Sequence, residues 1–211
     1  MSRTEPRADG SPVPAYHHGD LREALVRTGI EILEERGLAA LTLREVARRA
    51  GVSHAAPYHH FADKDALLSA IAARGVWMQN TRMARAMEEA PPPHDGLQAY
   101  GIAYAEFASE HPSLFRLMYS HERDSSSMDP RMVEASAAAF QSFLRGIQDR
   151  LGCSEAHAHS VSLTLWSSVH GLAMLWLDGQ LRWEGVPPLR DLATEVTNLL
   201  GALLTSPQKR S

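Results

Sequence analysis

Apolar side chains recur at intervals of three and four residues along most of the chain, a spacing that predicts amphipathic α-helices. In the first such segment Leu21, Leu25 and Ile32 share one face. We expect Asp20 to cap this helix and Gly37 to end it. The alternation typical of strands is not found over a useful length, so the pattern predicts an all-α protein. The predicted helices cover residues 20–37, 42–51, 53–61, 63–89, 95–110, 112–120, 129–151, 155–179 and 189–204.

Prolines and glycines divide these helices into two groups. Three consecutive prolines at 91–93 are the clearest interruption. Residues 1–15, which are rich in proline and poor in apolar side chains, predict a flexible arm. The expected organisation is this arm, a three-helix head, a larger helical domain and a short tail. The corresponding boundaries are 1–15, 16–62, 63–205 and 206–211.

Residues 42–61 predict two short helices joined by a tight turn. Thr42 and Glu45 have the spacing of a capping box, in which the threonine oxygen accepts from the Glu45 amide and the carboxylate reaches back. Gly51 can adopt the left-handed conformation that the turn requires. This pattern indicates a helix-turn-helix, with residues 53–61 as the helix that would enter a major groove. An ordinary corner between two helices of a bundle has the same spacing.

Charge and cysteine content narrow the possibilities. The formal net charge is −4 over 211 residues, which argues against general attraction to nucleic acid. Residues 42–64, however, include four basic side chains, two acidic ones and three histidines, so this segment is locally positive. The single cysteine, Cys153, excludes an intrachain disulfide and fits the reducing cytoplasm. Residues 158–177 carry no charge but include seven polar side chains, which favours a buried helix of a soluble protein over a membrane span.

Residues 21–71 resemble the N-terminal DNA-binding domain of TetR/AcrR-type transcriptional regulators. The resemblance is strongest in GVSHAAPYHHFADKDALL (51–68), where a tyrosine, a following His-Phe and Lys-x-x-Leu recur. It implies a homodimer that binds double-stranded DNA at a palindromic operator. The implied regulator is most often a repressor, which a small apolar effector releases.

The resemblance also implies which side chains contact DNA. Backbone-contacting positions fall on Thr42, Tyr58, His60 and Lys64, and base-reading positions fall on Ser53, His54, Ala55 and Pro57. Arg44 and His59 are further donors that could reach phosphate oxygens. The base-reading positions carry no arginine or asparagine for bidentate pairing, so specificity would rest on thymine methyl groups, DNA shape and the arm.

The last two predicted helices indicate a partner surface. LTLWSSVHGLAMLWLDGQL (163–181) is similar to the helix of one TetR-type C-terminal class, with Trp166, His170 and Gly171 as the matching residues. This helix is apolar around most of its circumference, so one face is expected to pack on its own domain and the other on a partner. Residues 189–204 carry a clean leucine stripe, and two such helices from each subunit would form a four-helix dimer interface. A monomeric helical core is the alternative.

Aromatic and methionine side chains in the second half could line an effector cavity, although such residues more often fill a core. The candidates are Tyr104, Phe107, Phe115, Met118, Phe143, Trp166 and His170. Catalytic, phosphate-binding and dinucleotide-binding motifs were not found, and no histidine pair has a carboxylate or cysteine at ligand spacing. We therefore expect no metal, cofactor or enzymatic activity. A helical enzyme with a site in the aromatic half and a protein-interaction module remain alternatives.

Overall fold

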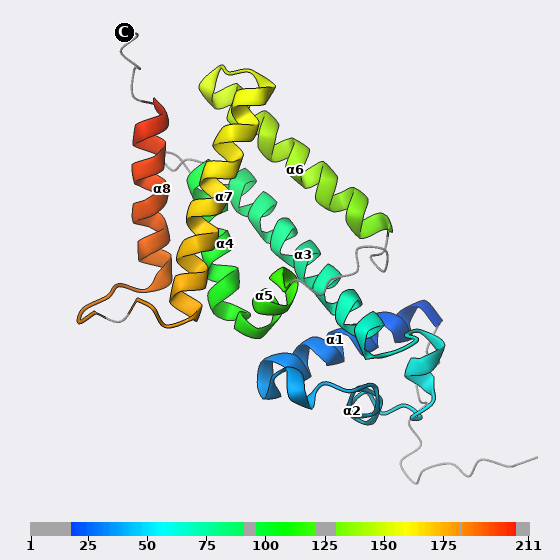
Figure 1. Ribbon diagram of the computed structural model, residues 1–211. Helices are drawn as coiled ribbons and strands as arrows, with labels where there is room; N and C mark the ends of the chain where they lie inside the picture. The colour runs from blue at the N-terminus through cyan, green and yellow to red at the C-terminus, as the bar shows by residue number, and fades with distance from the viewer. Residues whose placement is uncertain (1–17, 91–95, 121–129, 182, 206–211) are drawn as a thin grey trace, which may run out of the picture.

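A computed structural model describes residues 18–90, 96–120, 130–181 and 183–205, and within them every regular element is a helix (Figure 1). The prediction of an all-α fold is therefore confirmed. Two short elements, η1 and η2, are 3-10 helices. The elements are α1 (His18–Arg36), η1 (Leu38–Ala40), α2 (Leu43–Arg49), η2 (Ala56–His59), α3 (Lys64–Glu89), α4 (Gly96–Glu110), α5 (Pro112–Tyr119), α6 (Pro130–Leu151), α7 (Glu155–Leu177) and α8 (Leu189–Thr205).

The ends of the first helices follow from local chemistry. Gly37 has a φ of 75° and Gly51 a φ of 70°, so each ends its helix in the left-handed region that favours glycine. The Thr42 side chain accepts a hydrogen bond from the Glu45 amide at 3.1 Å, as predicted. The predicted cap at Asp20 is wrong, because α1 begins two residues earlier, at His18.

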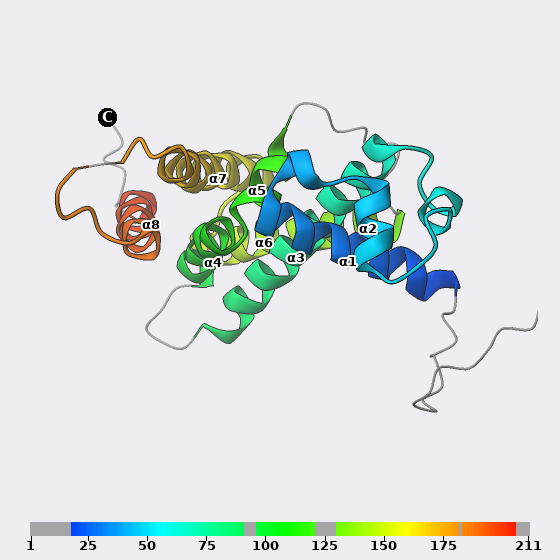
Figure 2. The ribbon, with the colours of Figure 1, turned by 90° about the horizontal axis from the view of Figure 1, so that it is seen from below.

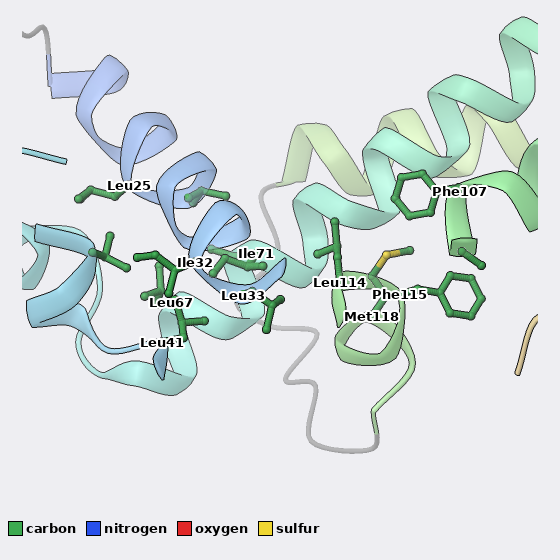
Figure 3. Packing of buried hydrophobic residues seen from close by; sticks show 14 of the residues in the cluster. Leu25, Ile32, Leu33, Leu41, Leu67, Ile71, Phe107, Leu114, Phe115 and Met118 are labelled. Atoms are coloured by element: carbon green, nitrogen blue, oxygen red, sulfur yellow. The ribbon is translucent and has the colours of Figure 1, made fainter. Parts of the chain in front are cut away.

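A small head and a larger helical body share one continuous apolar core. The head consists of α1, α2 and η2, and the long helix α3 runs from it into the body (Figures 1 and 2). Figure 3 shows Leu25 and Ile32 in the head, and Leu114 and Phe115 in the body, as members of the same buried cluster. A displacement in the body can therefore reach the head through packed side chains.

The apolar helices α7 and α8 lie at the end of the molecule opposite α2 (Figure 2). By length and composition alone α7 could cross a membrane, and only 28% of its most apolar stretch is buried in the protomer, so the helix predicted to be buried is covered on one side only by the described residues. Leu163 of α7 is 59% exposed, and Leu199 and Leu203 of α8 are 66% and 72% exposed. As predicted, one face of α7 packs on its own domain, against α4, α6 and α8, and another apolar face stays uncovered by the described residues.

Candidate DNA-contacting head and ligand cavity

The segment after the turn is shorter and tighter than predicted. The Val52 amide donates to Ala47 O at 3.0 Å and so fixes the turn against α2. The α-helix predicted over 53–61 is wrong: only Ala56–His59 is helical, and it is a 3-10 helix. Pro57 explains the difference, because its ring lacks an N–H and disfavours an α-turn beginning four residues earlier.

Most of the predicted DNA contacts lie on the surface of this head. Tyr58 is 54% exposed, and His60 and Lys64 are half-buried. Pro57 is buried, and its carbonyl accepts from the amides of His60 and Phe61 at 2.9 Å, so its assignment as a base reader is corrected to a structural role. The exposed candidates are Thr42, Arg44, Ser53, His54, Ala55, Tyr58 and His59.

Ion pairs within the head occupy three of its arginines. Glu45 accepts from Arg36 Nη1 at 2.7 Å and from Arg48 Nε at 2.8 Å, rather than reaching back to the Thr42 amide as predicted. The hydrogen bonds from Arg48 lower the pKa of Glu45 to about 2, so this carboxylate stays ionised at physiological pH. Arg49 pairs with Glu35 in a bidentate arrangement.

Two basic side chains of the 42–64 segment have no carboxylate partner among the residues that the structure describes. Among the described residues Arg44 forms no hydrogen bond or ion pair and is exposed at the start of α2. Lys64 Nζ donates only to a backbone carbonyl, that of Leu38, at 3.3 Å. The local positive charge available to an anion is therefore smaller than the sequence count indicates, and it is concentrated on these two side chains.

A carboxylate of the head caps a helix of the body. Glu34 on α1 accepts from the amides of Ser113 and Leu114 at 3.2 and 2.8 Å. These are the first amides of α5, a helix that begins with Pro112 and whose own N-cap residue, His111, makes no side-chain cap. A carboxylate at a helix N-terminus is favoured by both hydrogen bonding and the helix dipole. No local pattern indicates this contact, which spans 79 residues along the chain.

The body contains a cavity of about 550 Å³ bounded mainly by α3, α4, α6 and α7. Its walls are largely aromatic and aliphatic, and no Asp, Glu, Lys or Arg occurs among the described residues that line it. Cavities of this size and character are typical of small-molecule sites. The lining residues are Gln79, Asn80, Met83, Leu97, Tyr100, Gly101, Tyr104, Tyr119, Phe140, Phe143, His159, Ser162, Leu163, Leu165, Trp166, Val169 and Thr197.

Hydrogen bonds tie together several polar groups at the cavity wall. Trp166 Nε1 donates to the Tyr104 hydroxyl at 3.3 Å, and that hydroxyl lies 2.7 Å from His170 Nδ1. Burial lowers the pKa of His170, which favours the neutral imidazole. Tyr119, whose ring centroid lies 4.6 Å from that of His170, donates its hydroxyl to Gln79 Oε1 at 2.9 Å.

The cavity includes only part of the predicted set. Tyr104, Phe143 and Trp166 line it, whereas His170 lies behind the wall and contacts it through Tyr104. The prediction that Phe107, Phe115 and Met118 line it is corrected, because they are fully buried in the core between head and body (Figure 3).

Sequence reasoning missed the polar lining residues, above all Gln79. Gln79 lies on the inner face of α3, four residues from both Gly75 and Met83, which are also buried. A polar residue on an otherwise apolar helix face was the signal that could have identified it.

One expectation about metal ligands is corrected. Glu155 lies one helical turn before His159, and the Oε1 to Nε2 distance is 3.9 Å, so a carboxylate does occur at helix spacing from a histidine. Within the described part of the chain, no group of three or more His, Cys, Asp and Glu side chains comes close enough to hold a metal ion.

Both halves of the chain match models of related protein families. Residues 25–71 match the family described as bacterial regulatory proteins, tetR family. Residues 97–203 match the family described as tetracyclin repressor-like, C-terminal domain. Over 60 residues the chain is 43% identical to tetracycline repressor protein class C of Escherichia coli. That stretch is 28% of this chain and only 27% of the relative's length.

Solved structures extend the likeness over most of the chain. A protein of unknown function from Rhodococcus sp. RHA1 is 33% identical with a TM-score of 0.71, over 89% of this chain and 97% of that one. A TetR variant from Acinetobacter baumannii AYE, solved in complex with minocycline, has a TM-score of 0.61 at 17% identity, over 90% of this chain and 97% of that one. The second likeness concerns the fold alone.

Proposed function

Because the chain belongs to the TetR family of bacterial transcription regulators, we propose that it is a repressor that binds a palindromic operator as a homodimer. We assign residues 16–62 to DNA binding and residues 63–205 to dimerisation and effector binding. The predicted arm (1–15) and tail (206–211) lie outside the described residues. The observation that supports the proposal best is one continuous core that joins an exposed helix-turn-helix to a cavity with no Asp, Glu, Lys or Arg among its described lining residues.

The proposed DNA surface combines phosphate contacts with a small reading segment. Arg44 and Lys64 supply charge to phosphates, and the hydroxyl groups of Thr42 and Tyr58 add neutral donors. The histidines at 59 and 60 extend the same surface. Ser53, His54 and Ala55 are short enough to approach base edges, so operator choice depends on close fit and DNA shape rather than on bidentate pairing.

The exposed faces of α7 and α8 are the proposed dimer interface. Leu163, Leu175, Leu199 and Leu203 are large, apolar and exposed, a combination that marks a partner surface. Two helices from each protomer would bury these side chains in a four-helix arrangement. A dimer also holds two heads about 34–36 Å apart, the separation of successive major grooves.

Release by a small apolar effector requires that the cavity be coupled to the head. We assign this coupling to α3, which carries Gln79 and begins at Lys64, and to α5, which Glu34 of α1 caps. An effector that changes the tilt of α3 or the position of α5 changes the separation of the two heads. To move a 1:99 population to 99:1, it must prefer one state by about 5.5 kcal/mol.

Binding to the intergenic DNA beside the protein's own gene tests the proposal. A dimer that neutralises several phosphates should lose orders of magnitude in affinity between about 50 and 200 mM salt. Affinity that does not change with salt contradicts the proposal and favours an enzyme or a protein-interaction module. The proposal places the protein in the cytoplasm, where the DNA is, and assigns no catalytic residue, metal or cofactor.

A further inference from the structure

An amide in the cavity wall lacks a partner for its N–H groups. Gln79 on α3 is 2% exposed and lines the cavity. Its Oε1 accepts from the Tyr119 hydroxyl at 2.9 Å, while its Nε2 is buried with no hydrogen-bond partner among the described residues. A buried, unpaired N–H destabilises the folded protein unless something supplies an acceptor. Among the described residues one other buried side-chain atom, Ser136 Oγ, has no hydrogen-bond partner, and Ser136 lies outside the cavity lining.

Several polar groups of the wall bond to other protein groups. The Trp166 indole, the Tyr104 hydroxyl and His170 Nδ1 bond to one another. The Thr197 hydroxyl donates to the Ala193 carbonyl of its own helix at 2.7 Å. Among the described residues that line the cavity, Gln79 Nε2 is the fully buried side-chain atom without a hydrogen-bond partner, so it is the donor that gains most from an acceptor on a bound molecule.

The rest of the wall disfavours a charged ligand. The rings of Tyr100 and Phe143 are stacked with their centroids 4.1 Å apart. Phe140 and Trp166 add further aromatic surface. No Lys or Arg lines the described wall to pair with a buried carboxylate, and His159, the histidine of the lining, is exposed. No Asp or Glu lines the described wall to pair with a cation, which would also face the amide donor. An uncharged, mostly apolar molecule with one hydrogen-bond acceptor fits both the unpaired amide of Gln79 and the aromatic wall.

We propose that the cavity binds an uncharged, mostly apolar molecule that carries a carbonyl oxygen, such as a ketone, ester or lactone. Gln79 Nε2 donates to that oxygen, and the apolar body packs on the aromatic wall. The inference rests on the proposed function in one respect, that this cavity is the effector site. It adds the chemical class of the effector and the side chain that selects it.

Matched probes test the proposal on the full-length protein by isothermal titration calorimetry. Benzophenone carries one carbonyl between two rings, and diphenylmethane has the same shape without an acceptor. Diphenylacetate and benzyltrimethylammonium supply an anion and a cation. We expect benzophenone to bind about tenfold more tightly than diphenylmethane or better, and the two ions to bind more weakly than either. Equal binding of ketone and hydrocarbon, tightest binding of an ion, or no binding of benzophenone would overturn the proposal.

A pair of variants locates the donor. Gln79→Met removes the amide at nearly constant length, and we expect the ketone's advantage over the hydrocarbon to disappear. Gln141→Met makes the same change at an exposed position of α6 outside the cavity lining, and should keep the advantage. A ketone preference that survives Gln79→Met contradicts the assignment. The comparison of probes in the unaltered protein stands even if Gln79→Met does not fold.

Operator binding is measured in parallel, so that the two proposals fail separately. Selective ketone binding without release of DNA contradicts effector-driven release but leaves the ligand class standing. Salt-dependent DNA binding without ketone selectivity overturns the ligand class and leaves the DNA-binding role intact.

Discussion

The head and the body are both built from helices, but they differ in where their charged side chains lie and in which of them are paired. In the head, carboxylates hold Arg36, Arg48 and Arg49 in ion pairs, which leaves Arg44 and Lys64 as the basic side chains of the 42–64 segment that have no carboxylate partner among the described residues. In the body, no Asp, Glu, Lys or Arg occurs among the described residues of the cavity wall, and the Trp166, Tyr104 and His170 side chains are joined by hydrogen bonds. The comparison shows that what each region can bind depends on the charged and polar groups that have no partner inside the protein. The total number of such groups is a poor guide.

The largest effect is expected where the account depends on two heads acting together. Replacing both Leu199 and Leu203 by Glu places charges on the proposed interface, and we expect monomers in sedimentation velocity. Operator affinity should then fall by about a hundredfold or more, because the second head no longer binds as part of the same molecule. Val133→Glu, at an exposed apolar residue of α6, is the control and should leave the dimer intact.

The next effect concerns the unpaired charge of the head. Arg44→Ala should weaken binding to all DNA sequences by about tenfold and reduce the slope of log affinity against log salt by about one. Fluorescence anisotropy of a labelled duplex at several salt concentrations measures both quantities. Arg85→Ala removes an arginine that pairs with Glu89 near the far end of α3, and should change neither. An unchanged salt slope in Arg44→Ala would remove Arg44 from the phosphate surface.

A smaller effect is expected at the contact between the two regions. Glu34→Ala removes the acceptor at the start of α5 and should lower the free energy of unfolding in urea by about 1 kcal/mol. Glu34→Gln keeps one acceptor oxygen and should cost less. The account also expects Glu34→Ala to bind DNA as a dimer but to respond less to a cavity ligand. A full ligand response in this variant would show that α5 does not transmit the signal.

The smallest effect is a pH dependence in the cavity wall. Burial lowers the pKa of His170 below its ordinary value of 6.5, so the unfolded chain takes up a proton before the folded one does. Its contribution to stability is therefore complete above pH 6.5 and is lost as the pH falls below it, with a slope of at most about 1.4 kcal/mol per pH unit. The free energy of unfolding, measured with urea between pH 7.5 and 5.5, should fall less steeply with decreasing pH in His170→Gln than in the unaltered protein. The described carboxylates with a lowered pKa, Glu35, Glu45 and Glu110, titrate below this window.

The sequence predicted features that depend on neighbouring residues and missed those that depend on distant ones. The Thr42 cap and the left-handed turn at Gly51 follow from local chemistry, and both were predicted. The helix over 53–61 was predicted too long because apolar spacing outweighed the restriction that Pro57 imposes.

The cavity residues show the same difference between features that depend on neighbouring residues and features that depend on distant ones. Periodicity identifies Phe107, Phe115 and Met118 as inward-facing, but it cannot tell a side chain that fills a core from one that borders a space. The pairing of Gln79 with Tyr119 and of Glu34 with α5 arises only when helices far apart in the chain pack together. These contacts therefore had to come from the structure.

Stoichiometry on DNA tests the central claim most directly. Sedimentation velocity of the full-length protein on a labelled duplex from beside its own gene reports how many protomers each duplex carries. The account predicts two protomers bound together, and dissociation of both when a saturating cavity ligand is added. A single bound protomer, or a complex that persists with the cavity occupied, would contradict it.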